Sequence, residues 1–196
     1  MHGLINRSVQ CFLRDTYGVE AWQAIGAAAG APAEGFEPLL RYEDAITLRM
    51  IDVAAQRQGR PRDSLLEDLG TYLVSHPNRE GLRRLLRFGG VSYLDFLHSI
   101  DDLPGRGRLA VPDLDLPQFE LHDEGDGRFQ LSCRVPDPAF AAVMIGVLRA
   151  MADDYGALVL LDHAGQGPDG AELIVIELLD QSFATGRSFD LAAGMG

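Results

Sequence analysis

The sequence predicts an α+β fold, in which a helical N-terminal half packs against a C-terminal half built from a sheet and one long helix. Two observations predict it. Over the first hundred residues, apolar side chains recur at offsets of three and four, the period of an amphipathic helix. After Pro104, the segments QFELHDE and RFQLSCR alternate apolar and polar residues, the period of a half-buried strand. We expect a mainly antiparallel sheet of about four strands.

Helical periodicity divides the first half into six segments. Gly18 ends the first helix, and the turn-rich GAPAEG ends the second. The fourth helix is predicted to begin with a capping box formed by Ser64 and Glu67. The expected helices cover residues 4–17, 19–29 and 42–57, then a fourth that ends before HPN at 76–78, a short fifth over 82–88, and a sixth that carries His98 and ends near 102.

The second half contains the expected strands. The tripeptide GDG at 125–127 predicts a hairpin between the first two strands, and residues 138–155 return to helical spacing. ALVLLDH and AELIVIELLD are two further strands joined by the loop AGQGPDG. We expect one domain over 1–180, with a helical part at 1–102, an α/β part at 103–180 and a junction near 103–112. Residues 181–196 form a tail, poorly ordered at its end.

Composition and charge narrow the class of protein. The chain has 196 residues, of which 46% are hydrophobic and 23% charged, which is typical of a folded domain with its own core. No apolar run approaches the roughly 18 residues of a membrane-spanning helix. A net charge of −12 argues against partners such as nucleic acid or anionic membrane. Two cysteines, Cys11 and Cys133, and an N-terminus without leader features lead us to expect a reducing cytoplasm.

His98 stands among apolar residues of a predicted helix and has three interpretations. It is a core histidine with satisfied ring nitrogens, or a neutral imidazole that projects from a helix into an apolar slot as an axial iron ligand. A third interpretation pairs it with Asp101 or Asp102 for acid–base catalysis, although no nucleophile or metal constellation accompanies that pair.

Two segments give the chain a resemblance to a known family. The opening MHGLINRSVQCFLRDTYG and the later segment FLHSIDDLPGRGRLAVPDLDLPQF resemble, in order and spacing, two parts of haem nitric oxide/oxygen-binding domains. This family, also called H-NOX or HNOB, is related to the sensor domain of soluble guanylate cyclase. The resemblance covers about residues 1–180, and it implies the H-NOX fold with a haem cleft between the two halves.

The resemblance also implies a set of haem-binding residues. His98 corresponds to the axial ligand of the iron in haem b, and Pro112 to a proline that presses on the porphyrin. The family's propionate-binding motif, Tyr-x-Ser-x-Arg, corresponds to Gln130, Ser132 and Arg134, with glutamine in place of tyrosine. Apolar positions of the distal pocket correspond to Ile5, Val9 and Leu73.

The function implied by the resemblance is that of a gas sensor without catalytic activity. No tyrosine lies between Arg134 and Asp154 to donate a hydrogen bond to bound oxygen, so we expect nitric oxide, and also carbon monoxide, as ligands of ferrous haem. No cysteine follows Cys133, and His163 alone cannot bind zinc, so no zinc is expected. The implied effector is a histidine kinase or a cyclic-di-GMP enzyme on another chain. The alternative is a haem-free domain that binds another apolar ligand or acts as a protein-interaction module.

Two charged segments lie outside the residues that carry the resemblance, and the first of them has competing interpretations. The basic segment REGLRRLLRF is either a solvated helix face or a docking surface for an acidic partner or for haem carboxylates. Asp153 and Asp154 are interpreted as a solvated helix end. The arginines of the basic segment are Arg79, Arg83, Arg84 and Arg87.

Overall fold

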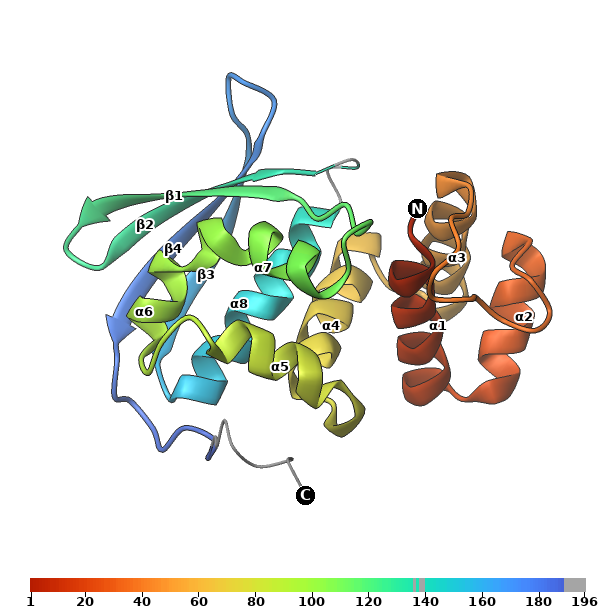
Figure 1. Ribbon diagram of the computed structural model, residues 1–196, viewed down its shortest axis with the longest axis horizontal. Coiled ribbons are helices and arrows are strands. Elements are labelled where there is room, and N and C mark those ends of the chain that lie inside the picture. The colour runs from red at the N-terminus through yellow and green to blue at the C-terminus, as the bar shows by residue number, and fades with distance from the viewer. Residues whose placement is uncertain (136, 138–139, 189–196) are drawn as a thin grey trace.

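The computed structural model describes residues 1–135, 137 and 140–188, and it confirms the α+β class. Figure 1 shows one group of helices at one end of the molecule and the sheet at the other, with two long helices between them. In the described part of the chain, no helix has the length and hydropathy that crossing a membrane requires.

Four helices build the N-terminal half. The fourth begins at Arg62 directly after Pro61, so Ser64 lies inside it and the predicted capping box is wrong. A proline fits a helix start because the first turn has no partner for its N–H. The four helices are α1 (Gly3–Tyr17), α2 (Val19–Ala29), α3 (Asp44–Gln58) and α4 (Arg62–Ser75).

The middle of the chain is more helical than the sequence suggested. The helix that carries His98 ends at that residue, a 3-10 turn follows, and a further helix forms where only a junction was expected. Pro104 is tolerated there because it lies in the first turn of that helix. The elements are the turn η1 (Pro77–Arg79), α5 (Glu80–Arg87), α6 (Tyr93–His98), the turn η2 (Ile100–Asp102), α7 (Leu103–Ala110) and α8 (Ala141–Tyr155).

The sheet has four antiparallel strands in the order β1-β2-β4-β3. The GDG hairpin is confirmed, and its turn places Asp126 at φ 53° and Gly127 at φ 78°. Figure 1 shows α6, α7 and α8 on one face of this sheet. The strands are β1 (Gln118–Gly125), β2 (Arg128–Arg134), β3 (Leu158–Gln166) and β4 (Glu172–Asp180).

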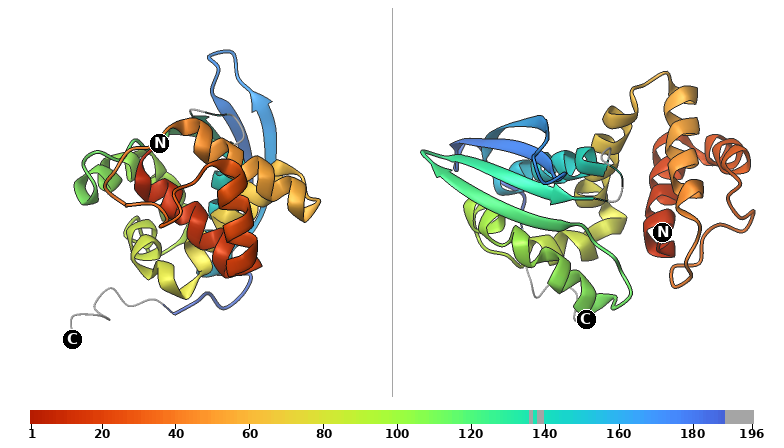
Figure 2. Two further views of the ribbon diagram at one scale, coloured as in Figure 1. Left: turned by 90° about the vertical axis from the view of Figure 1, so that its right-hand side faces the viewer. Right: turned by 90° about the horizontal axis from the view of Figure 1, so that it is seen from above.

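Two hydrophobic cores form, one at each end of the molecule. The N-terminal core is built mainly by α1–α4, and the C-terminal core lies between α6, α8 and the sheet. Helices α4 and α8 contribute to both, since Leu69 and Ala142 belong to the first core while Val74 and Met144 belong to the second. The views in Figure 2 show α1–α3 as a layer beside this helix pair. These two helices therefore connect the two cores directly.

Candidate functional site

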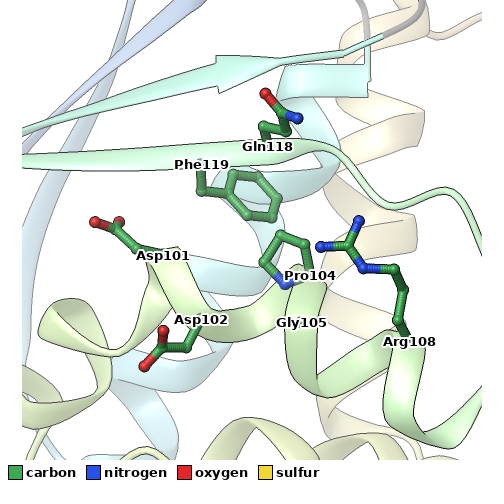
Figure 3. Close-up of a pocket in the computed structure, with 7 residues that line it drawn as sticks. All are labelled: Asp101, Asp102, Pro104, Gly105, Arg108, Gln118 and Phe119. Carbon is green, nitrogen blue, oxygen red and sulfur yellow. The ribbon is translucent and has the colours of Figure 1, made fainter.

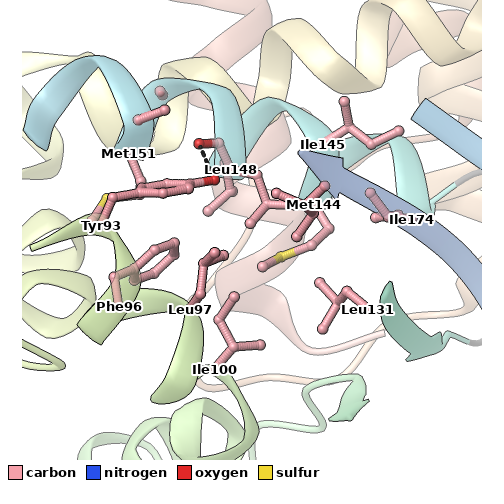
Figure 4. Close-up of a cluster of buried hydrophobic side chains, with 14 of the residues drawn as sticks. Tyr93, Phe96, Leu97, Ile100, Leu131, Met144, Ile145, Leu148, Met151 and Ile174 are labelled. Carbon is pink, nitrogen blue, oxygen red and sulfur yellow. Dashed lines mark hydrogen bonds between the residues drawn. The ribbon is translucent and has the colours of Figure 1, made fainter. Parts of the chain in front are cut away.

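The buried face of α6 consists of apolar and aromatic side chains that pack into the C-terminal core. Ser92 and Asp95 form a capping box at the start of this helix, which fixes its orientation. The buried hydroxyl of Tyr93 donates a hydrogen bond to the carbonyl of Leu148 on α8 at 3.2 Å. Figure 4 shows how the space between this helix and the sheet is filled by side chains of Tyr93, Phe96, Leu97, Ile100, Leu131, Met144, Leu148, Met151 and Ile174.

His98 lies at the exposed edge of this core. Its side chain is 54% exposed, and its Nε2 lies 4.0 Å from a carboxylate oxygen of Asp123 on β1. Its ring lies edge-on to Phe129, with 6.0 Å between the ring centroids. The predicted placement in an apolar slot is therefore wrong, because the helix is short and its buried side is already taken by Tyr93, Phe96 and Leu97.

The surface beside His98 is an open groove of about 500 Å³. Its floor includes Leu94 and Phe129, while Asp123, Asp126 and Asp180 bring negative charge to it. A porphyrin carries carboxylates of its own, and like charges repel. The groove therefore lacks both the enclosure and the charge that a haem ligated by His98 requires.

The predicted propionate-binding residues lie on the other face of the sheet. Side chains alternate along β2, and the buried ones are Phe129, Leu131 and Cys133. Gln130, Ser132 and Arg134 consequently face away from α6 and α8, as their greater exposure shows. The Arg134 guanidinium is 53% exposed and pairs with Asp169, which agrees with a solvated charge at a strand end. His98 and these three residues are on opposite sides of β2.

The remaining predicted positions lie elsewhere. Pro112 is exposed in the segment between α7 and β1. Val9 on α1 and Leu73 on α4 pack in the N-terminal core, and Ile5 is half-buried one helical turn before Val9. The structure thus brings Val9 and Leu73 together, but it places His98 beside the C-terminal core, at the other end of the molecule (Figure 1).

All five histidines lie in the described part of the chain, and the other four do not provide a better iron ligand. His2 is buried, and its Nδ1 accepts the amide of Leu4 at the start of α1. His76 stacks on Tyr72 at the end of α4, and His163 pairs with Glu172 at 2.8 Å. The fourth, His122, is exposed on β1. None of these side chains projects unpartnered into an enclosed apolar slot, so the residues present do not fit a histidine-ligated haem.

A second hollow, of about 320 Å³, lies between α7 and β1. Figure 3 shows Pro104 and Phe119 facing each other across it, with Arg108 at one side. Asp101 is already engaged, because its carboxylate accepts the amide of Leu121 at 3.0 Å and so holds β1 against η2. The lining holds no histidine, cysteine, methionine or tyrosine side chain to bind iron. Over the described residues, no group of three histidine, cysteine or acidic side chains could hold a metal ion.

Sequence reasoning missed a buried ion cluster centred on Asp154. This residue is 1% exposed, so the predicted solvated helix end is wrong for Asp154, whereas Asp153 is exposed as expected. Arg83 contacts its carboxylate through Nε at 2.9 Å and Nη2 at 2.8 Å, and Arg87 reaches it at 3.4 Å while lying over the Tyr155 ring. Arg83 is also buried, which contradicts a solvated face there. No local signal reveals this pair, because 71 residues separate its members along the chain.

The comparisons with known proteins agree with the fold. The HNOB family model, described as Haem-NO-binding, matches residues 2–163. Soluble guanylate cyclase 89Db of Drosophila melanogaster is 22% identical over 158 residues, which are 81% of this chain and 24% of that protein. Soluble guanylate cyclase gcy-31 of Caenorhabditis elegans is 22% identical over 154 residues, 79% of this chain and 22% of that protein. The chain thus spans about a quarter of the length of these relatives.

Solved structures show the same architecture at low identity. The H-NOX protein from S. oneidensis in the Fe(II) ligation state aligns with a TM-score of 0.80 at 15% identity, covering 94% of this chain and all of that one. The Fe(II) unliganded H-NOX protein from K. algicida aligns with a TM-score of 0.79 at 16% identity, with the same coverage of this chain. At such identities the likeness establishes the fold and not the site.

Proposed function

Because the chain belongs to the HNOB (haem-NO-binding) family, we propose that it is a regulatory domain that controls a separate effector by protein contact, and that it does so without a haem ligated by His98. One observation carries the second part. The His98 imidazole is 54% exposed beside three aspartates, while the residues proposed to hold propionates face the other side of the sheet. We propose no catalytic activity for this domain.

The shape and lining of the hollows support a protein, rather than a small apolar molecule, as the ligand of this domain. Small-molecule sites are enclosed and mostly apolar, whereas the two hollows beside His98 and between α7 and β1 are open and have charged side chains in their lining. The net charge of −12 favours a partner with a basic surface. A histidine kinase or a cyclic-di-GMP enzyme on another chain is the effector class suggested by the family resemblance.

A nitric oxide sensor is the second candidate, and family membership is the observation that favours it. In this candidate the chain binds haem b, takes up nitric oxide or carbon monoxide at ferrous iron, and signals to the same kind of effector. The fold is that of solved H-NOX proteins, one of them described in an Fe(II)NO ligation state. The two candidates differ in one measurable property, the occupancy of the domain by haem.

An absorption spectrum separates the candidates. The protein is expressed with haem supplied, purified by size exclusion, and compared with His98→Ala. We expect no Soret band that shifts with nitric oxide, and identical spectra for the two proteins. A stoichiometric Soret band that shifts with nitric oxide and disappears in His98→Ala would establish the gas sensor and overturn our proposal. A weak band that is equal in both proteins indicates haem adsorbed at the surface, and it leaves the proposal intact.

Native mass spectrometry tests the apolar-ligand alternative in the same preparation. The chain has a mass of 21.3 kDa, so an adduct of a few hundred daltons is resolved easily. We expect the mass of the bare polypeptide. A retained organic adduct that is lost only on denaturation would replace protein contact with small-molecule binding as the input to this domain.

A further inference from the structure

The segment that follows β4, residues 181–188, is held against the end of α8 by main-chain hydrogen bonds. We name this segment the C-terminal strap. The amide of Ala184 donates to the carbonyl of Gly156 at 3.0 Å, and the amide of Arg187 donates to the carbonyl of Asp154 at 2.9 Å. Figure 1 shows the chain leaving β4 and crossing the end of α8 toward α5. This part of the predicted tail is therefore docked, while residues 189–196 lie outside the described residues.

The strap lies backbone against backbone on α8. A Cβ added to Gly156, whose φ is +78°, would lie 2.1 Å from the carbonyl oxygen of Ala184. A Cβ added to Gly186 would lie 2.7 Å from the carbonyl oxygen of Asp154. Real Cβ atoms do not approach backbone oxygens so closely. The contact between the strap and the end of α8 therefore requires glycine at both positions.

One guanidinium connects the strap with two helices. Arg83 projects from α5, and its Nε and Nη2 contact the buried carboxylate of Asp154 on α8. The same Nη2 donates to the carbonyl of Ser188 in the strap at 3.1 Å. The Arg187 side chain of the strap completes the cluster, with its Nε 3.9 Å from the Asp154 carboxylate.

We propose that the strap is a latch that couples the position of α5 to the path of the chain after β4. Arg83 bonds to α8 and to the strap at once, so a displacement of α5 relative to α8 weakens both contacts together. Release of the strap removes a partner from Arg83 in turn, because coupling between two sites is reciprocal. The latch carries a rearrangement within the domain to whatever follows residue 188, and it operates whether or not the domain binds haem.

Hydrogen exchange of the full chain tests the latch. Gly186→Ala disrupts the contact between the strap and the end of α8, because the added methyl group overlaps the carbonyl oxygen of Asp154, and it changes no charge. We expect it to raise amide exchange in residues 181–188 by about tenfold or more, the change given by loss of one or two hydrogen bonds, and to raise exchange in α5 as well. Gly105→Ala is the matched control, because a Cβ there meets no atom within 4 Å. It is expected to leave exchange in both segments unchanged.

The reverse direction is tested from α5. Arg83→Lys keeps the charge, but a single ammonium cannot bridge Asp154 and Ser188 as a guanidinium does. We expect faster exchange at the amides of Ala184 and Arg187, which bond to the carbonyls of Gly156 and Asp154 at the end of α8 and not to Arg83. The latch is refuted if Gly186→Ala frees the strap while α5 exchanges as before, or if Arg83→Lys leaves both strap amides unaffected. Exchange in the unmodified strap at the rate of an unstructured peptide refutes it too.

Discussion

His98 and Leu97 are neighbours in the sequence, yet they differ completely in environment. Leu97 is fully buried in the C-terminal core, whereas His98 lies at the end of α6 with more than half of its side chain exposed. A helix turns 100° per residue, so adjacent side chains can face the core and the solvent. The sequence identified an apolar helix correctly, but it did not specify where that helix ends. The 3-10 turn after His98 places Ile100, rather than the imidazole, against the core.

Paired substitutions at these two positions measure this difference. We expect Leu97→Ala to lower the free energy of unfolding by about 2–5 kcal/mol, because it leaves a cavity in a packed core. His98→Ala is expected to change it by less than about 0.5 kcal/mol, as is typical of surface positions. Chemical denaturation of both variants checks the prediction. A loss of several kcal/mol in His98→Ala would contradict the exposed placement.

Cys133 illustrates the same alternation on β2. It faces the C-terminal core with no exposed surface, and burial, together with the smaller effect of the Glu172 charge, raises the pKa of its thiol to about 12. Because the thiolate is the reactive form, we expect a thiol reagent at pH 8 to modify Cys11, which is half-buried, and to spare Cys133 until the protein unfolds. Mass spectrometry after labelling counts the modified thiols, and Cys11→Ser should show none in the native protein. Equal labelling rates of the two cysteines would show that β2 is not packed as described.

At the scale of single elements, the capping box of α6 contains a carboxyl group, that of Asp95, whose pKa is shifted by the fold. Ser92 donates to the Asp95 carboxylate through its backbone amide and accepts the Asp95 amide through its hydroxyl, and the amide of Val91 also donates to that carboxylate. Hydrogen bonds from Ser92, followed by the one from Val91, lower the pKa of Asp95 below its usual value of 3.8. A carboxyl whose pKa is lower in the folded state stabilises the fold above its unfolded pKa. The contribution disappears as pH falls through the folded pKa.

Asp95→Asn tests that contribution, because asparagine keeps the shape and loses the charge. We expect the unmodified protein to be more stable than the variant at pH 7, and the gap to shrink as pH falls from 4 toward 2. Thermal unfolding followed by circular dichroism across this range provides the measurement. Asp63→Asn, near the start of α4, is a useful comparison, since its carboxylate takes part in no capping box. A gap that stays constant from pH 7 to pH 2 would show that the Asp95 charge does not support α6.

Most elements were predictable because they are local. The hairpin, the four strands and the long helix α8 follow from periodicity and turn chemistry, and so they agree with the expectation. Helix α7 was missed because Pro104 and two glycines lower its intrinsic propensity, and tertiary contacts override that preference. The Asp154 cluster could not be predicted, because its partners come from α5, α8 and the strap, which are distant in the sequence. Local patterns likewise do not reveal which face of β2 points toward which helix.

At the scale of the whole molecule, one close helix crossing joins the two cores. A Cβ on Gly70 of α4 would lie 2.0 Å from the carbonyl oxygen of Val143, and a Cβ on Gly146 of α8 would lie 2.0 Å from that of Glu67. The two backbones therefore touch directly, with a glycine on each side of the contact. Because α4 and α8 each belong to both cores, this crossing sets how the helical half sits on the sheet half.

Gly146→Ala should push the two helices apart. Alanine has the better helix propensity by about 1 kcal/mol, but the methyl group overlaps a backbone oxygen that cannot move alone. We expect a net loss of about 1–3 kcal/mol in the free energy of unfolding, and faster hydrogen exchange in both cores. Gly81→Ala in α5 is the matched control, since its Cβ meets no atom within 4 Å, and it should be neutral or slightly stabilising. Calorimetry of the unmodified protein should show one transition, because neither core is complete without α4 and α8. Two separate transitions, or a stabilised Gly146→Ala, would mean that the halves fold independently and that the crossing transmits nothing between them.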